Sequence, residues 1–145
     1  MTKIIKSIFL VFIWSSIAST AIANESFYDE ALKMYKDKKY DDAKFLFERH
    51  IVYNPKNVGS YLFLAKIYNK KEDQKKEEQN LNTVLLIEPT NEEAILMSMK
   101  IALEKSNYSK VKDLSGTFVK VCKKLCDEND SIKQSLQNIE SKNES

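Results

Sequence analysis

Apolar side chains recur every three or four positions along most of this chain, which is the spacing of a helix that buries one face. On this spacing we expect helices at about residues 27–38, 40–53, 61–68, 74–87, 91–103, 107–125 and 130–141. The sequence contains only two glycines and two prolines, so turns should be few and helices long. The pattern predicts an all-α fold.

The two prolines mark the ends of two of these helices. A residue that precedes a proline avoids the helical region of backbone space, so helices should stop before Pro55 and Pro89. After the second stop, Thr90 or Asn91 can cap the next helix, and Asn107 can start the helix that follows it.

The same prolines close a repeated pattern. Ala43, Phe47, Ile51 and Pro55 follow one another in steps of four, and Glu77, Leu81, Leu85 and Pro89 do the same. The two sets are 34 positions apart, from 55 to 89, which is the length of a helix–turn–helix repeat unit. One such pair cannot bury its own apolar faces, so the pairs must stack on one another.

These positions resemble the tetratricopeptide repeat. The first copy matches it at Phe27, Ala31, Tyr40, Ala43, Phe47, Ile51 and Pro55, and the second at Tyr61, Leu64, Ala65, Tyr68, Leu81, Leu85 and Pro89. Glu77 stands where the family has alanine, so we expect looser packing of the second pair. A third copy from about Glu92 keeps Ile95 and Val111 but has no closing proline.

The resemblance implies a right-handed α-solenoid of about three helix pairs, followed by a C-terminal capping helix. It places the repeat domain at residues 24–129, and the capping helix with a polar tail at residues 130–145. The alternative is an unrelated helical bundle with chance periodicity, and the agreement of two copies at several spaced positions argues against it.

The first 23 residues have the pattern of a cleavable signal peptide. Lys3 and Lys6 precede an apolar run at residues 8–14, and Ala21-Ile22-Ala23 is a cleavage pattern of small residues. The apolar run is short for a membrane anchor, which needs about 20 residues. We expect cleavage after Ala23 and a periplasmic or secreted protein with no stable membrane anchor.

Charge narrows the range of partners. The whole chain has 23 basic and 21 acidic residues, and removal of Lys3 and Lys6 leaves the mature chain close to neutral. A nucleic-acid-binding protein has a strong basic excess, which is lacking here. We therefore expect another protein or peptide as the partner and no nucleic acid.

Cys122 and Cys126 lie one helical turn apart, which brings their Cα atoms to about 6 Å, within the range of a disulfide. In an oxidising compartment we expect them to be bridged, with the helix loosening near its end. The alternatives are two free buried thiols or a metal or redox role, although a C-x-x-x-C without histidine is a weak zinc signal.

The sequence gives little reason to expect catalysis. His50 is the only histidine, and it falls at a packing position of the repeat. Without a second histidine there is no metal triad or evident acid–base pair, and no nucleophile or phosphate-binding motif occurs. We expect no enzyme activity, no cofactor and no metal site.

The resemblance implies a concave groove lined by the first helix of each pair. The groove residues it assigns are Tyr28, Leu32, Tyr35, Leu62, Phe63, Lys66, Asn69, Lys70, Leu96, Met97 and Lys100. Aromatic and aliphatic side chains would anchor a peptide or helix, and the lysines would attract its acidic residues. The alternative is that these residues pack against the capping helix or a second copy of the chain.

The function expected from the sequence is therefore that of an exported interaction module, such as an adaptor or assembly factor for an envelope or secretion complex. The alternative is a structural subunit or homodimer whose groove is permanently buried.

Overall fold

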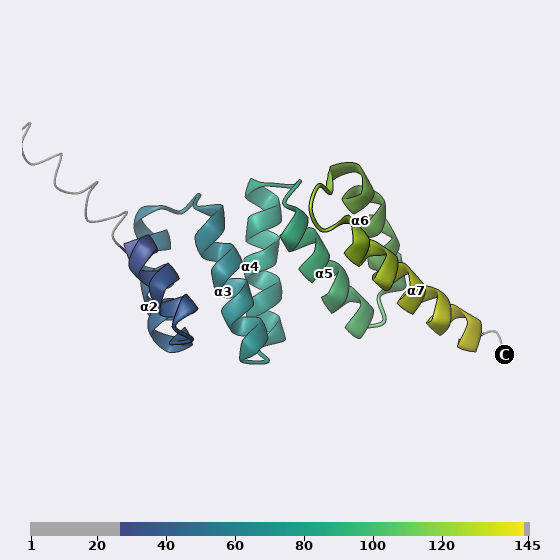
Figure 1. The fold of residues 1–145 in the computed structure, drawn as a ribbon, viewed down its shortest axis with the longest axis horizontal. Coiled ribbons are helices and arrows are strands. Elements are labelled where there is room, and N and C mark those ends of the chain that lie inside the picture. Colours follow the sequence, from purple (N-terminus) through teal and green to yellow (C-terminus); the bar gives the residue numbers. More distant parts are fainter. Residues whose placement is uncertain (1–26, 144–145) are drawn as a thin grey trace, which may run out of the picture. The chain divides into compact units, whose positions relative to one another are not determined.

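The computed structural model describes residues 27–143, with side chains to Ile139. Over this range the chain forms seven helices and no strand (Figure 1). A first helical stretch at residues 27–36 is followed by α2 (Tyr40–Tyr53), α3 (Val58–Lys70), α4 (Gln74–Ile87), α5 (Glu92–Glu104), α6 (Tyr108–Val121) and α7 (Cys126–Asn143). The all-α prediction is confirmed. None of the described helices is long and apolar enough to cross a membrane, and the expected signal peptide at residues 1–23 lies outside the described residues.

The helices end where the prolines and caps predict. The last residue of α2 is Tyr53 and that of α4 is Ile87, each two residues before a proline. Of the two candidate caps for α5, Asn91 is the one used: its side chain accepts a hydrogen bond from the N–H of Ala94 (3.0 Å). Asn107 caps α6 in the same way, through the N–H of Lys110 (3.1 Å).

The two predicted helix boundaries around Cys122 and Cys126 are wrong. The sixth helix was expected to run through Cys122 to about residue 125, but α6 ends at Val121 and Cys122 has extended backbone (φ −62°, ψ 141°). The next helix starts at Cys126 rather than near Asp130, so residues 127–130 are helical and form no loop. The expected boundary between the repeat domain and the capping helix therefore falls inside α7.

The chain forms two compact units that divide between Ser60 and Tyr61. In the first unit, Ala31, Ala43 and Phe47 are fully buried. In the second unit α5 packs against α4, α6 and α7, and α6 packs against α7. Its main core cluster is built by Ile95, Met99, Val111, Phe118, Ile132 and Leu136 from the last three helices.

The repeat is visible in the backbone as well as in the side chains. Lys38, Glu72 and Ser106 are the three non-glycine residues with positive φ among the described residues (61°, 57° and 56°). They are spaced by the repeat length, and each lies in the turn inside a helix pair. After each of them the next N–H donates to a carbonyl of the preceding helix: Lys39 to Met34 (2.9 Å), Asp73 to Tyr68 (3.0 Å) and Asn107 to Ala102 (2.8 Å). The third pair is therefore a full structural copy, despite its degenerate sequence.

Candidate functional site

The second unit contains a cleft of about 710 Å³. Its walls are Leu62 of α3, the turn between α4 and α5, the first turn of α5, the end of α6, and the segment that joins α6 to α7. Apolar lining comes from Leu62, Val121 and Leu125, and charged lining from three glutamates and three lysines. We call this cavity the cleft.

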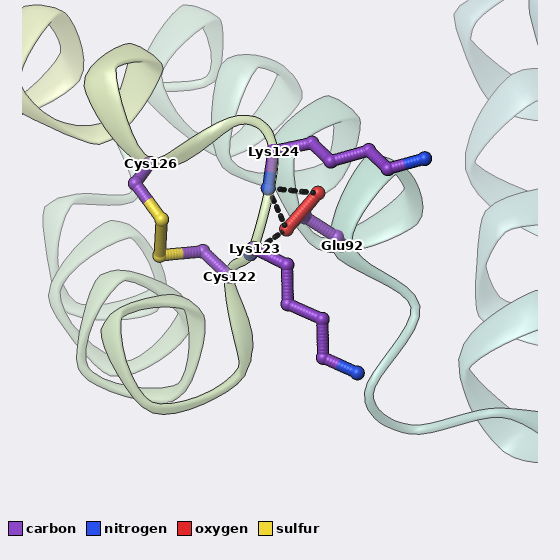
Figure 2. The surroundings of a disulfide bond; sticks show 5 residues. All are labelled: Glu92, Cys122, Lys123, Lys124 and Cys126. Carbon is purple, nitrogen blue, oxygen red and sulfur yellow. Dashed lines mark hydrogen bonds between the residues drawn. A yellow bond between two sulfur atoms is a disulfide. The ribbon is translucent and has the colours of Figure 1, made fainter.

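The three glutamates of the cleft already have partners. Glu88 accepts a hydrogen bond from the Asn91 amide (3.0 Å), and Glu93 forms an ion pair with Lys66 (2.8 Å). Glu92 accepts from the backbone N–H groups of Lys123 and Lys124, and these bonds lower the pKa of its carboxyl group (Figure 2). The side chains of Lys120, Lys123 and Lys124 are exposed. The cleft therefore offers basic groups beside an apolar wall.

Glu92 and the disulfide together hold the segment between α6 and α7. Cys122 and Cys126 are bridged, with their Cα atoms 5.4 Å apart, and Figure 2 shows the Glu92 carboxylate against the backbone between them. The predicted disulfide is thus present in the structure. The helix does not merely loosen there but stops, and the bridge spans the break.

The repeat count explains why this turn needs such support. Counting 34 residues on from Pro55 and Pro89 gives Lys123, and counting on from the capping residues Asn57 and Asn91 gives Leu125. The side chains of Asn57 and Asn91 each accept an N–H bond at the start of the next helix, which leucine cannot do. Lys123 also has an N–H where proline has none, and Glu92 accepts it. The disulfide and Glu92 therefore take the place of a proline and an asparagine cap.

In the first unit, the predicted groove residues are partly committed to packing. The ring of Tyr28 lies edge-on to Phe47 (centroids 5.8 Å apart) and near His50 (5.3 Å), and Tyr35 lies edge-on to Tyr40 (5.5 Å). Leu32 is half-buried. Tyr28 and Tyr35 therefore contribute to the cohesion of the unit, and each keeps part of its surface exposed.

In the second unit, Leu62, Phe63 and Lys66 lie together on α3 and are half-buried. The ammonium group of Lys66 lies 4.9 Å from the centre of the Phe63 ring as well as in its ion pair with Glu93. Leu62 lines the cleft. This is the part of the predicted groove that the structure brings next to a cavity.

Further along α3, Asn69 and Lys70 are exposed. The Asn69 amide donates to Glu77 of α4 (3.1 Å). Glu77 is 4% exposed, and burial raises the pKa of its carboxyl group. Asn69 therefore supports the buried glutamate that stands where the repeat has alanine.

The predicted role of α5 needs correction. Leu96 was expected to be an exposed anchor, but it is 6% exposed and belongs to the core cluster that contains residues of α7. Lys100 forms an ion pair with Glu128 of α7 (3.2 Å), whereas Met97 remains half-exposed. Leu96 therefore packs in the core with residues of α7, whereas Lys100 contacts α7 through an ion pair and keeps an exposed side chain.

The sequence-based prediction missed Lys120, Lys123 and Lys124 as lining of a cavity. The signal that could have found them is the repeat count itself. It places Lys123 at a proline position and so marks a turn, which would have exposed the neighbouring lysines. Among the described residues, no group of three or more His, Cys, Asp or Glu side chains is arranged to hold a metal ion.

Comparisons by sequence give no relative. No protein-family model matches the chain, and no curated protein matches it in sequence.

Comparison by structure gives the fold. The Yersinia enterocolitica type III secretion chaperone SycD, in complex with a peptide of the translocator YopD, superposes with a TM-score of 0.70 at 14% identity, over 82% of this chain and 93% of that one. The first tetratricopeptide domain of Spaghetti (RPAP3), bound to an HSP90 peptide, gives 0.70 at 13% identity, over 80% and 92%. The Arabidopsis OM64 tetratricopeptide domain gives 0.69 at 17%, over 79% and 94%.

Proposed function

We propose, from the tetratricopeptide-type fold that this chain has, that the protein is an interaction module that holds a peptide or a helix of another protein. Similar solved structures carry bound peptides, from YopD in one case and from HSP90 in another. A binding role also agrees with a sequence that contains no catalytic motif. The observation that carries the proposal is the cleft, whose apolar wall and exposed lysines suit a segment with apolar and acidic side chains.

The residues that we propose for binding line the cleft, and they differ in part from those expected on sequence alone. Lys66 and Lys100, expected to attract acidic residues, already form ion pairs with Glu93 and Glu128. Lys123 and Lys124 take over this role, with Leu62 as the apolar anchor that belongs to both the predicted groove and the cleft. Phe63 and Met97 can extend the apolar surface.

Selection from a random-peptide display library tests this proposal. The mature chain should enrich peptides that contain acidic residues, and their affinity should fall with ionic strength because the contacts are exposed charges. Leu62→Asp should weaken a selected peptide about tenfold or more, and Lys124→Glu several-fold, as expected for an anchor and a rim charge. Fluorescence anisotropy measures both.

The matched controls are Leu86→Asp and Lys75→Glu, which make the same changes on exposed positions of α4. They should bind as the wild type does. The proposal would be contradicted if no peptide were enriched. It would also be contradicted if the control variants weakened peptide affinity as much as the cleft variants do. A stable dimer in which Leu62 is protected would instead support the structural-subunit alternative.

We further propose that the protein acts outside the cytosol, as an adaptor or assembly factor of an envelope or secretion complex. The signal-peptide pattern at residues 1–23 supports export, and a disulfide at Cys122 and Cys126 suits an oxidising compartment. N-terminal sequencing of the protein from its native cell should begin at Asn24. A chain that retains Met1 and fractionates with the cytosol would refute export.

A further inference from the structure

A second cavity lies between α6 and α7. Leu62, the proposed peptide anchor, does not line it. It has a volume of about 410 Å³ and is lined by apolar side chains of both helices, including Val119, Ile132 and Leu136. Val119 is 55% exposed, and nothing lies within 4 Å of where a Cβ on Gly116 would be. We call this cavity the α6–α7 groove. Ile132 and Leu136 belong to the core cluster and are buried, so Val119 is the apolar side chain that the groove exposes to solvent.

The repeat pattern indicates which element would pack against α7 in a further helix pair. Counting 34 residues on from Phe27, Tyr61 and Ile95 gives Asn129, so α7 has the position of a first helix of a fourth pair. In the three earlier pairs the chain turns back at Lys38, Glu72 and Ser106, which puts the next turn at residue 140. The helix α7 instead continues to Asn143. The described chain therefore supplies no second helix for α7.

The lining of the α6–α7 groove also defines the charge of its occupant. Lys112, Lys120 and Lys133 line it, and no acidic side chain is among its described lining residues. Lys120 and Lys133 are exposed. A helix that fits this surface needs an apolar stripe flanked by carboxylates, which would lie opposite the lysines.

A second copy of this chain fits the groove poorly. A symmetric dimer places the same patch of each copy against the other, so the lysine-lined grooves would face one another. Like charges brought together in this way oppose association. The charge favours a different chain.

We propose that the α6–α7 groove binds an acidic amphipathic helix of a partner protein, which takes the position that the second helix of a fourth pair would have. This binding site shares Lys120 with the cleft, and its other described lining residues differ from those of the cleft. The variants that distinguish the two surfaces are Val119→Asp and Lys133→Glu for the groove, and Leu62→Asp for the cleft, because none of these residues lines both cavities.

The test uses the mature full-length chain and two designed helical peptides. Both carry the same leucine and valine stripe; one has glutamates on its flanks and the other has lysines. Isothermal titration should give micromolar binding of the glutamate peptide and at least tenfold weaker binding of the lysine peptide. Val119→Asp should weaken the glutamate peptide at least tenfold, and Lys133→Glu about threefold with a smaller dependence on salt.

The titrations use a Leu62→Asp background, because the glutamate peptide also has the chemistry that we propose for the ligand of the cleft. Leu86→Asp in this background is the control and should leave the binding unchanged. Val119 and Lys133 are exposed, and circular dichroism establishes that their variants keep the fold. Equal binding of the two peptides, or no binding of either below about 1 mM, would overturn the proposal. So would a dimer, seen by light scattering, that Val119→Asp dissociates, because the occupant would then be a second copy.

Discussion

At the scale of single residues, the molecule buries polar side chains at repeat positions where small or apolar ones are usual. His50 is 4% exposed, and both of its ring nitrogens have partners: Nδ1 lies 2.7 Å from the Ser60 hydroxyl, and Nε2 lies 2.8 Å from the Asn54 amide nitrogen. Because the amide nitrogen donates to Nε2, the proton of the neutral ring lies on Nδ1. The sequence-based expectation of a packing histidine is confirmed.

The titration of His50 is directly measurable because it is the only histidine in the chain. Burial lowers the pKa of its ring. A depressed pKa of this kind contributes stability above the unfolded value of about 6.5, and that stability is lost as the pH falls through the folded pKa. NMR of the imidazole should therefore show a midpoint below 6.5 in the folded protein and near 6.5 in urea. A folded midpoint above that in urea would contradict the buried, neutral ring.

Glu77 should limit stability at neutral pH. Burial raises the pKa of its carboxyl group, so the stability associated with the protonated form is present at low pH and is lost as the pH rises through the folded value. Glu77→Gln keeps a hydrogen-bond acceptor for Asn69 and removes the charge. It should stabilise the protein by on the order of 1 kcal/mol at pH 7, with a smaller gain at pH 4, in urea unfolding followed by circular dichroism. Glu72→Gln, at an exposed turn, is the control; a loss of stability for Glu77→Gln at pH 7 would show that the charged hydrogen bond outweighs burial.

At the scale of helices and turns, the three pairs share one backbone plan with different capping chemistry. The residues before α2, α4 and α6 have nearly the same dihedral angles: Lys39 (−82°, 68°), Asp73 (−89°, 72°) and Asn107 (−88°, 72°). Asp73 and Asn107 cap their helices through the side chain, and Lys39 makes no such bond. The first pair therefore lacks a stabilising contact that its backbone could accommodate.

Lys39→Asn should supply this missing cap. An asparagine in the geometry of Asn107 would accept the N–H of Asp42, and caps of this kind contribute about 1 kcal/mol. Thermal unfolding should show a higher midpoint. Lys39→Gln removes the same charge but has a side chain too long to cap, and should leave the midpoint nearly unchanged. Equal effects of the two substitutions would mean that charge, and not capping, is responsible.

The two glycines should respond in opposite directions to alanine. Gly116 lies inside α6 with open space around its Cβ position, so Gly116→Ala should stabilise the helix by about 0.5–1 kcal/mol. A Cβ on Gly59 would clash with the hydroxyl of Tyr28, whose ring is held by Phe47 and His50. Gly59→Ala should therefore cost about 1–3 kcal/mol. Tyr28→Phe, which removes the clashing oxygen, should recover part of this loss in chemical denaturation; no recovery would place the strain elsewhere.

Most of the helix ends could be predicted because they depend on local chemistry: a proline that cannot continue a helix, or an asparagine that caps the next one. The break at Cys122 could not, because the apolar spacing continues through it. Cys122 and Leu125 still pack against the core cluster although they are not helical. The burial of Leu96 and the ion pairs of Lys66 and Lys100 depend on contacts between distant helices, which a one-dimensional pattern does not contain.

At the scale of the whole molecule, the described chain ends in a helix that is held by few elements. The helix α7 packs against α5 and α6, and the disulfide ties its first residue to the end of α6. The ion pair between Lys100 and Glu128, and the hydrogen bond of Ser115 to Asn129 (2.8 Å), add polar contacts near the same end. The α6–α7 groove depends on the placement of this helix, and the cleft depends on the segment that precedes it.

Reduction of the disulfide should therefore loosen α7 first. Chain-entropy estimates for so short a loop give a loss of about 2 kcal/mol. Hydrogen exchange in α7 should be faster in the reduced protein than in the oxidised protein. Exchange in α4, which α5 and α6 separate from α7 in the sequence, should change little. A Cys122→Ala, Cys126→Ala variant should behave like the reduced protein. Uniform acceleration in all helices would show that the bridge stabilises the fold as a whole.

The bridge around Lys123 and Lys124 also affects what a protease can do to this protein. Both lysines are exposed in the non-helical segment between α6 and α7, and the chain on either side is joined through sulfur. A trypsin cut after Lys123 or Lys124 would open the backbone and still leave one covalent molecule. Such a nicked protein would migrate as a full-length chain on a non-reducing gel and separate into two fragments only after reduction. In an environment rich in proteases, the part of the protein that we propose for binding would outlast the cleavage of its own backbone.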